Sequence, residues 1–182
     1  MRERHWILPM LIAVALLLGA LAANAGVAAA PACGGVAFSV LERKNDRPRG
    51  LLRTARFHSA SVVKAMLMVV VLRRAHGRRL SVVERARLRP MITTSDNDAA
   101  NAVYNDVGGR SLRRVARRAG MKRFTEVGHW AEARITAADQ SRLFLQIDKL
   151  VPRSHRRYAR KLLSSIVRGS AGASPGPRGD VT

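Results

Sequence analysis

FHSASVVKAMLMVVV, residues 57–71, is one of the most apolar runs in this chain, and a lysine lies inside it. The run stays apolar on nearly all sides to Leu72, which predicts a buried central helix that begins near Ser59 or Ser61 and ends at Gly77. Burying the ammonium of Lys64 in such a helix is costly unless polar partners compensate for it. The simplest alternative is a lysine at the helix edge whose ammonium extends to solvent.

Ser61 precedes Lys64 by three residues, so in a helix the two side chains point the same way. A serine hydroxyl is a weak nucleophile until a base takes its proton. A lysine in a dry site has a lowered pKa, and its neutral amine can then act as that base. The helix N-terminus adds a positive field that favours developing negative charge. The pair therefore fits an acyl-transfer nucleophile with its activating base.

A second motif, Ser95-Asp96-Asn97, lies in the stretch MITTSDNDAAN, residues 91–101, at a break between two predicted helices. Serine, aspartate and asparagine are also common helix-capping residues, so a cap alone is the alternative explanation. S-x-x-K followed by S-D-N is, however, the ordered pair of motifs found in class A β-lactamases and penicillin-binding proteins.

On these residues, 34–168 resemble the serine β-lactamase and penicillin-binding protein superfamily, in particular its short, secreted, class A-like serine hydrolases. HSASVVK and MITTSDNDAAN carry most of the resemblance, and ITAADQSRLF, residues 135–144, is similar to a helix-start segment of those relatives. The resemblance implies an α/β (α+β) fold, with an antiparallel sheet flanked by helices and an all-α half. It also implies acyl transfer from a β-lactam or a D-Ala-D-Ala-like peptide, with no cofactor.

The resemblance assigns a role to each motif residue. Ser61 corresponds to the acylated nucleophile and Lys64 to the base that deprotonates it. Ser95 corresponds to the residue that passes a proton to the leaving nitrogen. Asn97 corresponds to the residue that holds Lys64 and the substrate amide, and Asp96 to a residue that fixes the loop.

The sequence departs from the family pattern after Asn97, because no K-[ST]-G motif follows. In the family this motif lies on a strand that binds the substrate carboxylate and borders the oxyanion hole. The last predicted helix is followed by a low-complexity segment where further strands of the sheet are expected. We therefore expect a C-terminally truncated relative with an incomplete sheet, and a catalytically inactive relative is an open alternative.

The deacylating glutamate of class A β-lactamases lies in an E-x-x-L-N segment that this sequence lacks. HWAEARITAAD, residues 129–139, is in roughly the right place but is short. Glu132 is its only glutamate, and Glu126 lies just before it; neither matches the pattern. Glu132 is retained as the candidate deacylation base, and without such a base an acyl-enzyme is expected to persist.

The N-terminus is typical of an export signal, with Arg2 and Arg4 ahead of an apolar run from Ile7 to Ala23. Cleavage after Ala25 is expected, with Ala30 as a second candidate, and an uncleaved membrane anchor is the alternative. The predicted organisation is a signal peptide over 1–25, a linker over 26–33, the β-lactamase-like domain over 34–168 and a disordered tail over 169–182. The protein is expected to be secreted or extracytoplasmic.

Further elements follow from the apolar spacing and from capping signals. Residues 36–42 and 51–57 are predicted to form a β-hairpin. Residues 80–88 are predicted to be a helix with a Ser81–Glu84 capping box, ended by Pro90. Further helices are predicted from 95 to a turn at Gly108-Gly109, over 111–119, from Thr136 to about 150, and over 158–167.

The formal net charge of +21 makes a polyanion-binding module a second functional alternative. Its candidate cations are Arg113, Arg114, Arg117, Arg118, Arg156, Arg157, Arg160 and Lys161. Cell-wall polyanions are possible partners, no specific nucleic acid is expected, and membrane contact is expected only through the N-terminal segment. The one cysteine excludes an intrachain disulfide, and the scattered histidines give no metal-ligand spacing. A monomer is expected.

Overall fold

The computed structural model describes residues 36–42, 44 and 47–166. The predicted signal peptide, linker, Cys33 and C-terminal tail lie outside these residues. Within the described part of the chain, no helix is both long enough and apolar enough to cross a membrane.

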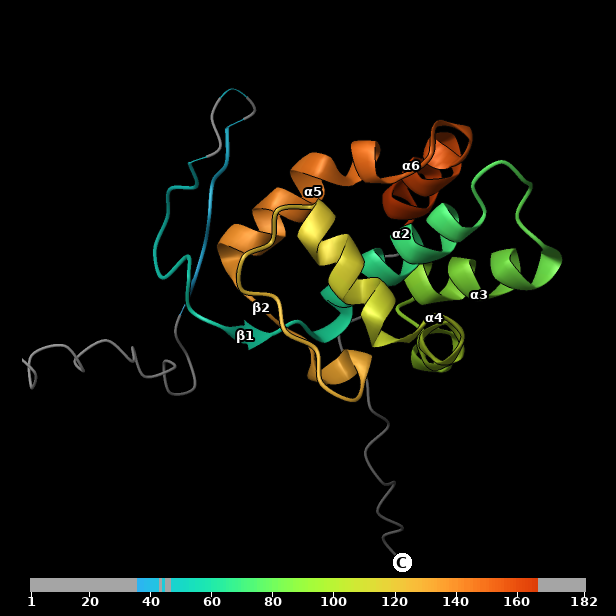
Figure 1. The fold of residues 1–182 in the computed structure, drawn as a ribbon, viewed down its shortest axis with the longest axis horizontal. Coiled ribbons are helices and arrows are strands. Elements are labelled where there is room, and N and C mark those ends of the chain that lie inside the picture. Colours follow the sequence, from blue (N-terminus) through green and yellow to red (C-terminus); the bar gives the residue numbers. More distant parts are fainter. Residues whose placement is uncertain (1–35, 43, 45–46, 167–182) are drawn as a thin grey trace, which may run out of the picture. The chain divides into compact units, whose positions relative to one another are not determined.

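The central element is helix α2, Lys64–Arg74, which continues from the 3₁₀ turn η2, Ala60–Val63. Every residue from Lys64 to Leu72 is buried, as the apolar run predicts. Helices α3 (Val82–Thr93), α4 (Asn97–Arg118) and α5 (Ala137–Leu150) all pack against it (Figure 1). This all-round burial makes α2 the core of the described domain.

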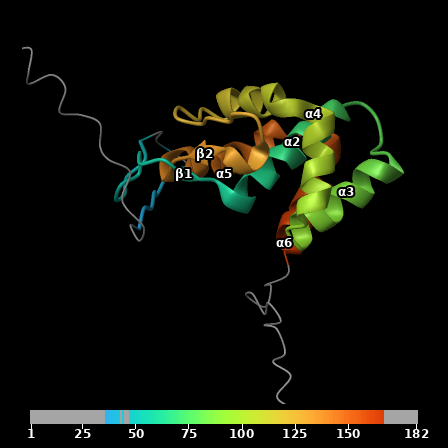
Figure 2. The ribbon, with the colours of Figure 1, turned by 90° about the horizontal axis from the view of Figure 1, so that it is seen from below.

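Helix α6, Arg156–Ser164, follows the 3₁₀ turn η4, Arg153–His155, and packs against α3 (Figure 2). A helix is predicted over 158–167, and α6 begins two residues earlier than that. The predicted capping box is confirmed: Ser81 Oγ accepts from Glu84 N at 3.0 Å, and Glu84 Oε2 accepts from Ser81 N at 2.7 Å. Thr136 likewise caps α5 by accepting from Asp139 N at 3.1 Å.

α4 contains a break at Gly108, whose φ of 67° and ψ of 159° are not helical. The predicted Gly108-Gly109 turn is therefore a kink between two helical segments of α4. Beyond it the amphipathic prediction is confirmed. Leu112, Val115 and Ala116 are buried, and Arg113, Arg114, Arg117 and Arg118 are exposed.

Two short strands form the only sheet in the described residues. β1 (Phe57–His58) pairs antiparallel with β2 (Arg134–Ile135), with Phe57 opposite Ile135 and His58 opposite Arg134. An isolated bridge joins Arg134 to Thr125 on the other side. The sheet thus ties the start of the central helix to a segment more than 70 residues later in the chain.

The predicted hairpin of 36–42 and 51–57 is only partly right. Val40 and Arg49 form one antiparallel bridge, and Phe38 N donates to Leu51 O at 3.1 Å, but neither segment becomes a continuous strand. Val36, Phe38 and Val40 are 71%, 52% and 61% exposed. A strand is stable when a second layer covers its apolar face, and in the described residues this face is uncovered.

The prediction that Pro90 ends a helix is wrong. α3 continues through Pro90 to Thr93, because Met91 and Ile92 after the proline are buried and their packing outweighs the hydrogen bond that proline cannot donate. The Pro90 carbonyl then accepts from both Thr94 N and Asp96 N, at 3.1 and 3.2 Å. These bonds shape the turn that leads into the Ser95-Asp96-Asn97 motif.

Candidate active site

Ser61 lies in η2, one turn before the buried start of α2. The preceding residue, Ala60, has a φ of 45°, a left-handed conformation that costs a non-glycine residue roughly 1–2 kcal/mol. Ser59 N donates to Ala133 O at 2.8 Å, which continues the β1–β2 pairing up to this turn. Ser59 precedes the turn as predicted, but its hydroxyl donates to Ala60 O at 3.3 Å and forms no cap.

Lys64 is only 2% exposed, and its ammonium is fully bonded to oxygen atoms. It donates to Ser95 O at 2.5 Å, to Ser95 Oγ at 3.0 Å and to Asn97 Oδ1 at 2.7 Å. Three acceptors match the three donors of a lysine ammonium. The lysine is therefore held in place by the second motif and does not extend to solvent.

Ser95 has a φ of 58°, again in the left-handed region. This conformation directs both its carbonyl and its hydroxyl to Lys64. The hydroxyl in turn donates to Ser61 Oγ at 2.8 Å. Ser61, Ser95 and Lys64 thus form a continuous hydrogen-bonded path, in which Lys64 reaches Ser61 only through Ser95.

Burial lowers the pKa of Lys64 from its usual value, and the charge of Asp96 partly opposes that shift. Desolvation disfavours the ammonium, so the neutral amine becomes more accessible than in a solvated lysine. Asp96 itself caps α4, accepting from Ala99 N at 2.7 Å. It holds the turn in which Ser95 and Asn97 lie.

Trp130 was not singled out by sequence reasoning, yet its ring centroid lies 5.1 Å from Lys64 Nζ. The ring is 5% exposed, and its Nε1–H donates to Asn101 Oδ1 at 2.8 Å. Trp130 begins the 3₁₀ turn η3, Trp130–Glu132. An aromatic face at this distance attracts a cation and also excludes water from it. The one signal in the sequence that Trp130 lies near the site is its position two residues before Glu132.

Glu126 lies in a second buried cluster. Its carboxylate accepts from Tyr104 Oη and from Arg113 Nη1, the latter at 2.6 Å. Burial and the hydrogen bond to Glu126 raise the pKa of Tyr104 to about 12. The His129 ring contacts the Tyr104 ring at 5.4 Å and the Trp130 ring at 5.3 Å. Glu126 therefore supports the segment that carries Trp130.

Glu132 is exposed at the end of η3, one residue before the carbonyl that Ser59 bonds. Among the described residues, no hydrogen bond or ion pair joins its carboxylate to Ser61, Lys64 or Ser95. Its assignment as a deacylation base stays a prediction. The described residues also hold no group of three or more His, Cys, Asp or Glu side chains that suits a metal ion.

The arrangement can transfer a proton. A hydroxyl at the end of a hydrogen-bonded path to a partly desolvated amine is the geometry that activates a nucleophile. Ser61 lies on a 3₁₀ turn and Lys64 at the start of a buried helix, so the core fixes both positions.

Comparison with known proteins supports the same grouping. A model of a family described as the beta-lactamase enzyme family matches residues 76–172, more than half of the chain, including the Ser95-Asp96-Asn97 motif. A search of curated proteins gave no match.

Among solved structures, similar folds include an engineered variant of the reconstructed class A β-lactamase of the last common ancestor of Gram-negative bacteria, bound to 5(6)-nitrobenzotriazole. It has a TM-score of 0.59 and 21% identity, with 75% of this chain and 66% of that chain covered. A β-lactamase from Desulfarculus baarsii has a TM-score of 0.57 and 19% identity, with 75% and 65% covered. An ancestral class A β-lactamase has a TM-score of 0.57 and 22% identity, with 75% and 67% covered.

The chain thus spans about two thirds of the length of these structures. At this low identity, the similar structures give information about the fold alone. They agree with the expected β-lactamase-like α/β architecture, and the described residues contain mainly its helical part. The family model covers the second motif and the four helices α3 to α6. The chain belongs to the beta-lactamase enzyme family.

Proposed function

We propose that this protein is a serine hydrolase that transfers an acyl group from a β-lactam or a D-Ala-D-Ala-like peptide to Ser61. The observation that carries the proposal is the path from Ser61 Oγ to Ser95 Oγ to Lys64 Nζ, with links of 2.8 and 3.0 Å. The buried position of Lys64 and its lowered pKa support its role as the base. No cofactor takes part in the proposed reaction.

In the proposed reaction, neutral Lys64 accepts the Ser61 proton through the Ser95 hydroxyl. Ser61 Oγ bonds to the substrate carbonyl carbon, and the carbon–nitrogen bond then breaks. Ser95 gives its proton to the leaving nitrogen and is then reprotonated by Lys64. The net result is that the leaving amine of the substrate gains one proton for the one that Ser61 loses, and Lys64 is neutral again. Asn97, which accepts from Lys64 at 2.7 Å, orients the amine and is placed to bind the substrate amide.

Acylation is the direct test. Full-length protein incubated with a fluorescent penicillin is expected to gain the mass of one penicillin, and Ser61→Ala is expected to gain none. Intact-protein mass spectrometry measures the adduct, and circular dichroism verifies that the variant is folded. No adduct on folded wild-type protein would favour the alternative of a catalytically inactive relative.

Glu132 is the proposed base for deacylation, and it has a separate test. If it activates the hydrolytic water, Glu132→Gln is expected to lengthen the lifetime of the acyl-enzyme by roughly 10²–10⁴-fold, the range of general-base catalysis. The measurement is the decay of the penicillin adduct after excess reagent is removed. Glu42→Gln provides an isosteric control in another segment, and an unchanged lifetime in Glu132→Gln would reject the assignment.

Such a substrate also implies a location. Peptidoglycan-like peptides lie outside the cytoplasm, and the predicted N-terminal signal accords with export. As part of the same proposal, we infer that the protein acts outside the cytoplasm. We also propose that it is a monomer.

A further inference from the structure

A second feature is the groove between α3 and α6, whose lining includes neither Ser61 nor Lys64. One pocket, of about 480 Å³, is lined by residues 77–80 with Arg85, Ser154, His155 and Tyr158. An adjoining pocket, of about 910 Å³, is lined by Val82, Arg85, Ala86, Arg89, Pro90, Thr93, Thr94, Tyr158, Lys161, Leu162 and Ser165. Arg85 and Tyr158 line both, so the two form one continuous α3/α6 groove.

The charge of this groove has a single sign. Of the described residues that line either pocket, none is acidic and five are cations: Arg78, Arg79, Arg85, Arg89 and Lys161. Glu84 neutralises only the first, through two bonds of 2.7 and 2.8 Å to Arg78. That ion pair lowers the pKa of Glu84 to about 2, which keeps the carboxylate ionised and committed to Arg78.

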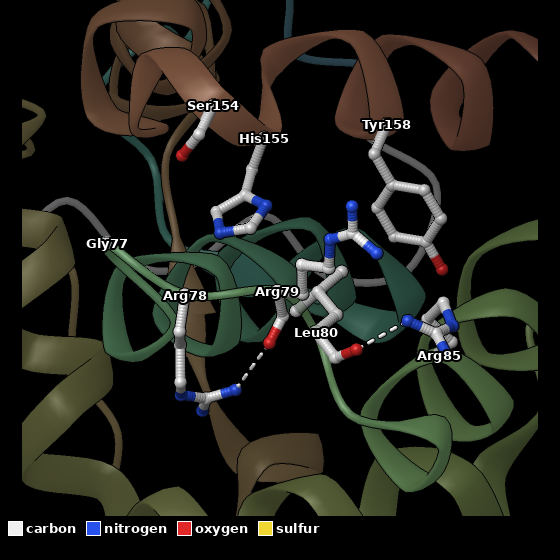
Figure 3. Close-up of a pocket in the computed structure, with 8 residues that line it drawn as sticks. All are labelled: Gly77, Arg78, Arg79, Leu80, Arg85, Ser154, His155 and Tyr158. Atoms are coloured by element: carbon white, nitrogen blue, oxygen red, sulfur yellow. Dashed lines mark hydrogen bonds between the residues drawn. The ribbon is translucent and has the colours of Figure 1, made fainter.

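Three of the other four cations are free to bind a ligand. Within the described residues, the side chains of Arg79, Arg89 and Lys161 have no hydrogen-bond or ion-pair partner, and all three are exposed. Figure 3 shows the Arg79 side chain extending between His155 and Tyr158, on the side opposite to Arg78. Arg85 is anchored by a bond to the Leu80 carbonyl. A cluster of unpaired like charges in one groove favours an anionic ligand.

The positions of these groups are fixed by the fold. His155 is buried and its Nε2 lies 3.0 Å from Ala75 O, so that nitrogen donates and the ring is locked against the end of α2. Arg85 and Arg89 are four residues apart on α3, which places them about 6 Å apart along the helix axis. Lys161 faces them from α6. The groove therefore has Arg79 in one pocket, Arg89 and Lys161 in the other and Arg85 in both, with Leu162, Pro90 and Ala86 among its apolar lining.

Cations spread over two adjoining pockets suit an extended chain with several anionic groups. Proteins that bind single-stranded nucleic acid add several aromatic platforms on which bases stack. Among the described residues, Tyr158 is the only Phe, Tyr or Trp that lines the groove, and the ring of His155 is buried. We propose that the α3/α6 groove binds a base-free phosphodiester polymer, a polyol phosphate chain, whose phosphates contact Arg79, Arg85, Arg89 and Lys161.

The test uses the full-length protein and end-labelled poly(glycerol phosphate), with binding followed by fluorescence anisotropy over a range of salt concentrations. The triple variant Arg79→Gln, Arg89→Gln, Lys161→Gln removes the unpaired cations of the groove. The matched control, Arg110→Gln, Arg117→Gln, Lys122→Gln, removes the same charge from other exposed positions. Thermal unfolding verifies that both variants are folded.

The groove variant is expected to bind at least tenfold more weakly, while the control changes by less than twofold. The slope of log affinity against log salt concentration is expected to become less steep by roughly 2, because each of the three lost phosphate contacts contributes about 0.7 to it. Equal weakening of both variants, or no binding by the wild type, would overturn the proposal in favour of diffuse charge. Tenfold tighter binding of a single-stranded oligonucleotide of equal phosphate number would overturn the assigned ligand. Ser61→Ala is expected to bind the polymer normally, so this result does not depend on the acylation test.

Discussion

Replacing Lys64 by methionine is expected to slow acylation of Ser61 by roughly 10²–10⁴-fold, the contribution of a positioned general base. Methionine keeps the length and apolar stem of the side chain but cannot accept a proton. Ser95 remains in place to bond Ser61, so the loss measures the missing amine. The measurement is the rate of adduct formation with the fluorescent penicillin, by intact-protein mass.

The same substitution is expected to leave stability unchanged or raised. A buried ammonium carries a desolvation cost that methionine lacks. Ser95 and Asn97 are exposed, so water can supply the donors that their oxygens lose. A loss of activity without a loss of thermal stability would separate the chemical role of Lys64 from a packing role. Acylation that stays within tenfold of wild type would reject Lys64 as the base.

The pH dependence provides a second readout of Lys64. Because its pKa is lowered in the folded protein, the amine becomes neutral below the unfolded value of 10.5. Between the two values the unfolded chain binds the extra proton, so wild-type stability rises with pH in that window. The difference in the free energy of unfolding between Lys64→Met and the wild type, in favour of the variant, is therefore expected to be largest at lower pH and to shrink toward pH 10.5. Acylation by the wild type is expected to rise through the same lowered pKa.

Lys64→Arg is the matched control for charge. Arginine keeps a cation that can donate to Ser95 and Asn97, but it is not deprotonated in proteins. Acylation is expected to be lost as fully as in Lys64→Met. Retained activity in the arginine variant would show that the positive charge, and not the free amine, matters.

Leu67→Ala is expected to cause the largest loss of stability, roughly 2–5 kcal/mol. Leu67 is fully buried in α2, one turn after Lys64. Truncation removes buried apolar surface and leaves a cavity that a helix packed on all sides closes only partly. For a domain of this size the change corresponds to a fall in Tm of about 4–20 °C.

Differential scanning calorimetry measures this effect, and Val83→Ala is its control. Val83 is 55% exposed on α3, so its truncation is expected to change the free energy of unfolding by less than about 0.5 kcal/mol. Equal effects of the two truncations would contradict the placement of α2 at the centre of the core.

Local features of the fold were largely predictable from the sequence. The capping box of α3, the caps of α4 and α5 and the break at Gly108 all depend on residues a few positions apart. The same holds for Ser61 and Lys64, because helical geometry alone places residues three apart on one face. The burial of α2 also followed from its composition.

Contacts between distant segments were not predictable in the same way. The sequence suggested that residues 51–57 pair with 36–42. In the described residues only a bridge and one further hydrogen bond join that region, whereas Phe57 pairs with Ile135 and His58 with Arg134. Alternating apolar residues, such as Val36, Phe38 and Val40, indicate a strand but do not identify the segment with which that strand pairs. Pro90 was predicted to end its helix by a local rule that the buried residues after it outweigh.

By itself the sequence determined the buried central helix, the caps of α3, α4 and α5 and the two motifs that carry the candidate chemistry. Only the tertiary structure decided that Ser95, 34 residues from Ser61, stands between that hydroxyl and Lys64, and that Trp130 covers the amine. The physical reason is that hydrogen-bonded turns and caps are set by neighbours along the chain. The burial that lowers the pKa of Lys64 instead requires side chains from α2, the turn before α4 and η3 to pack together.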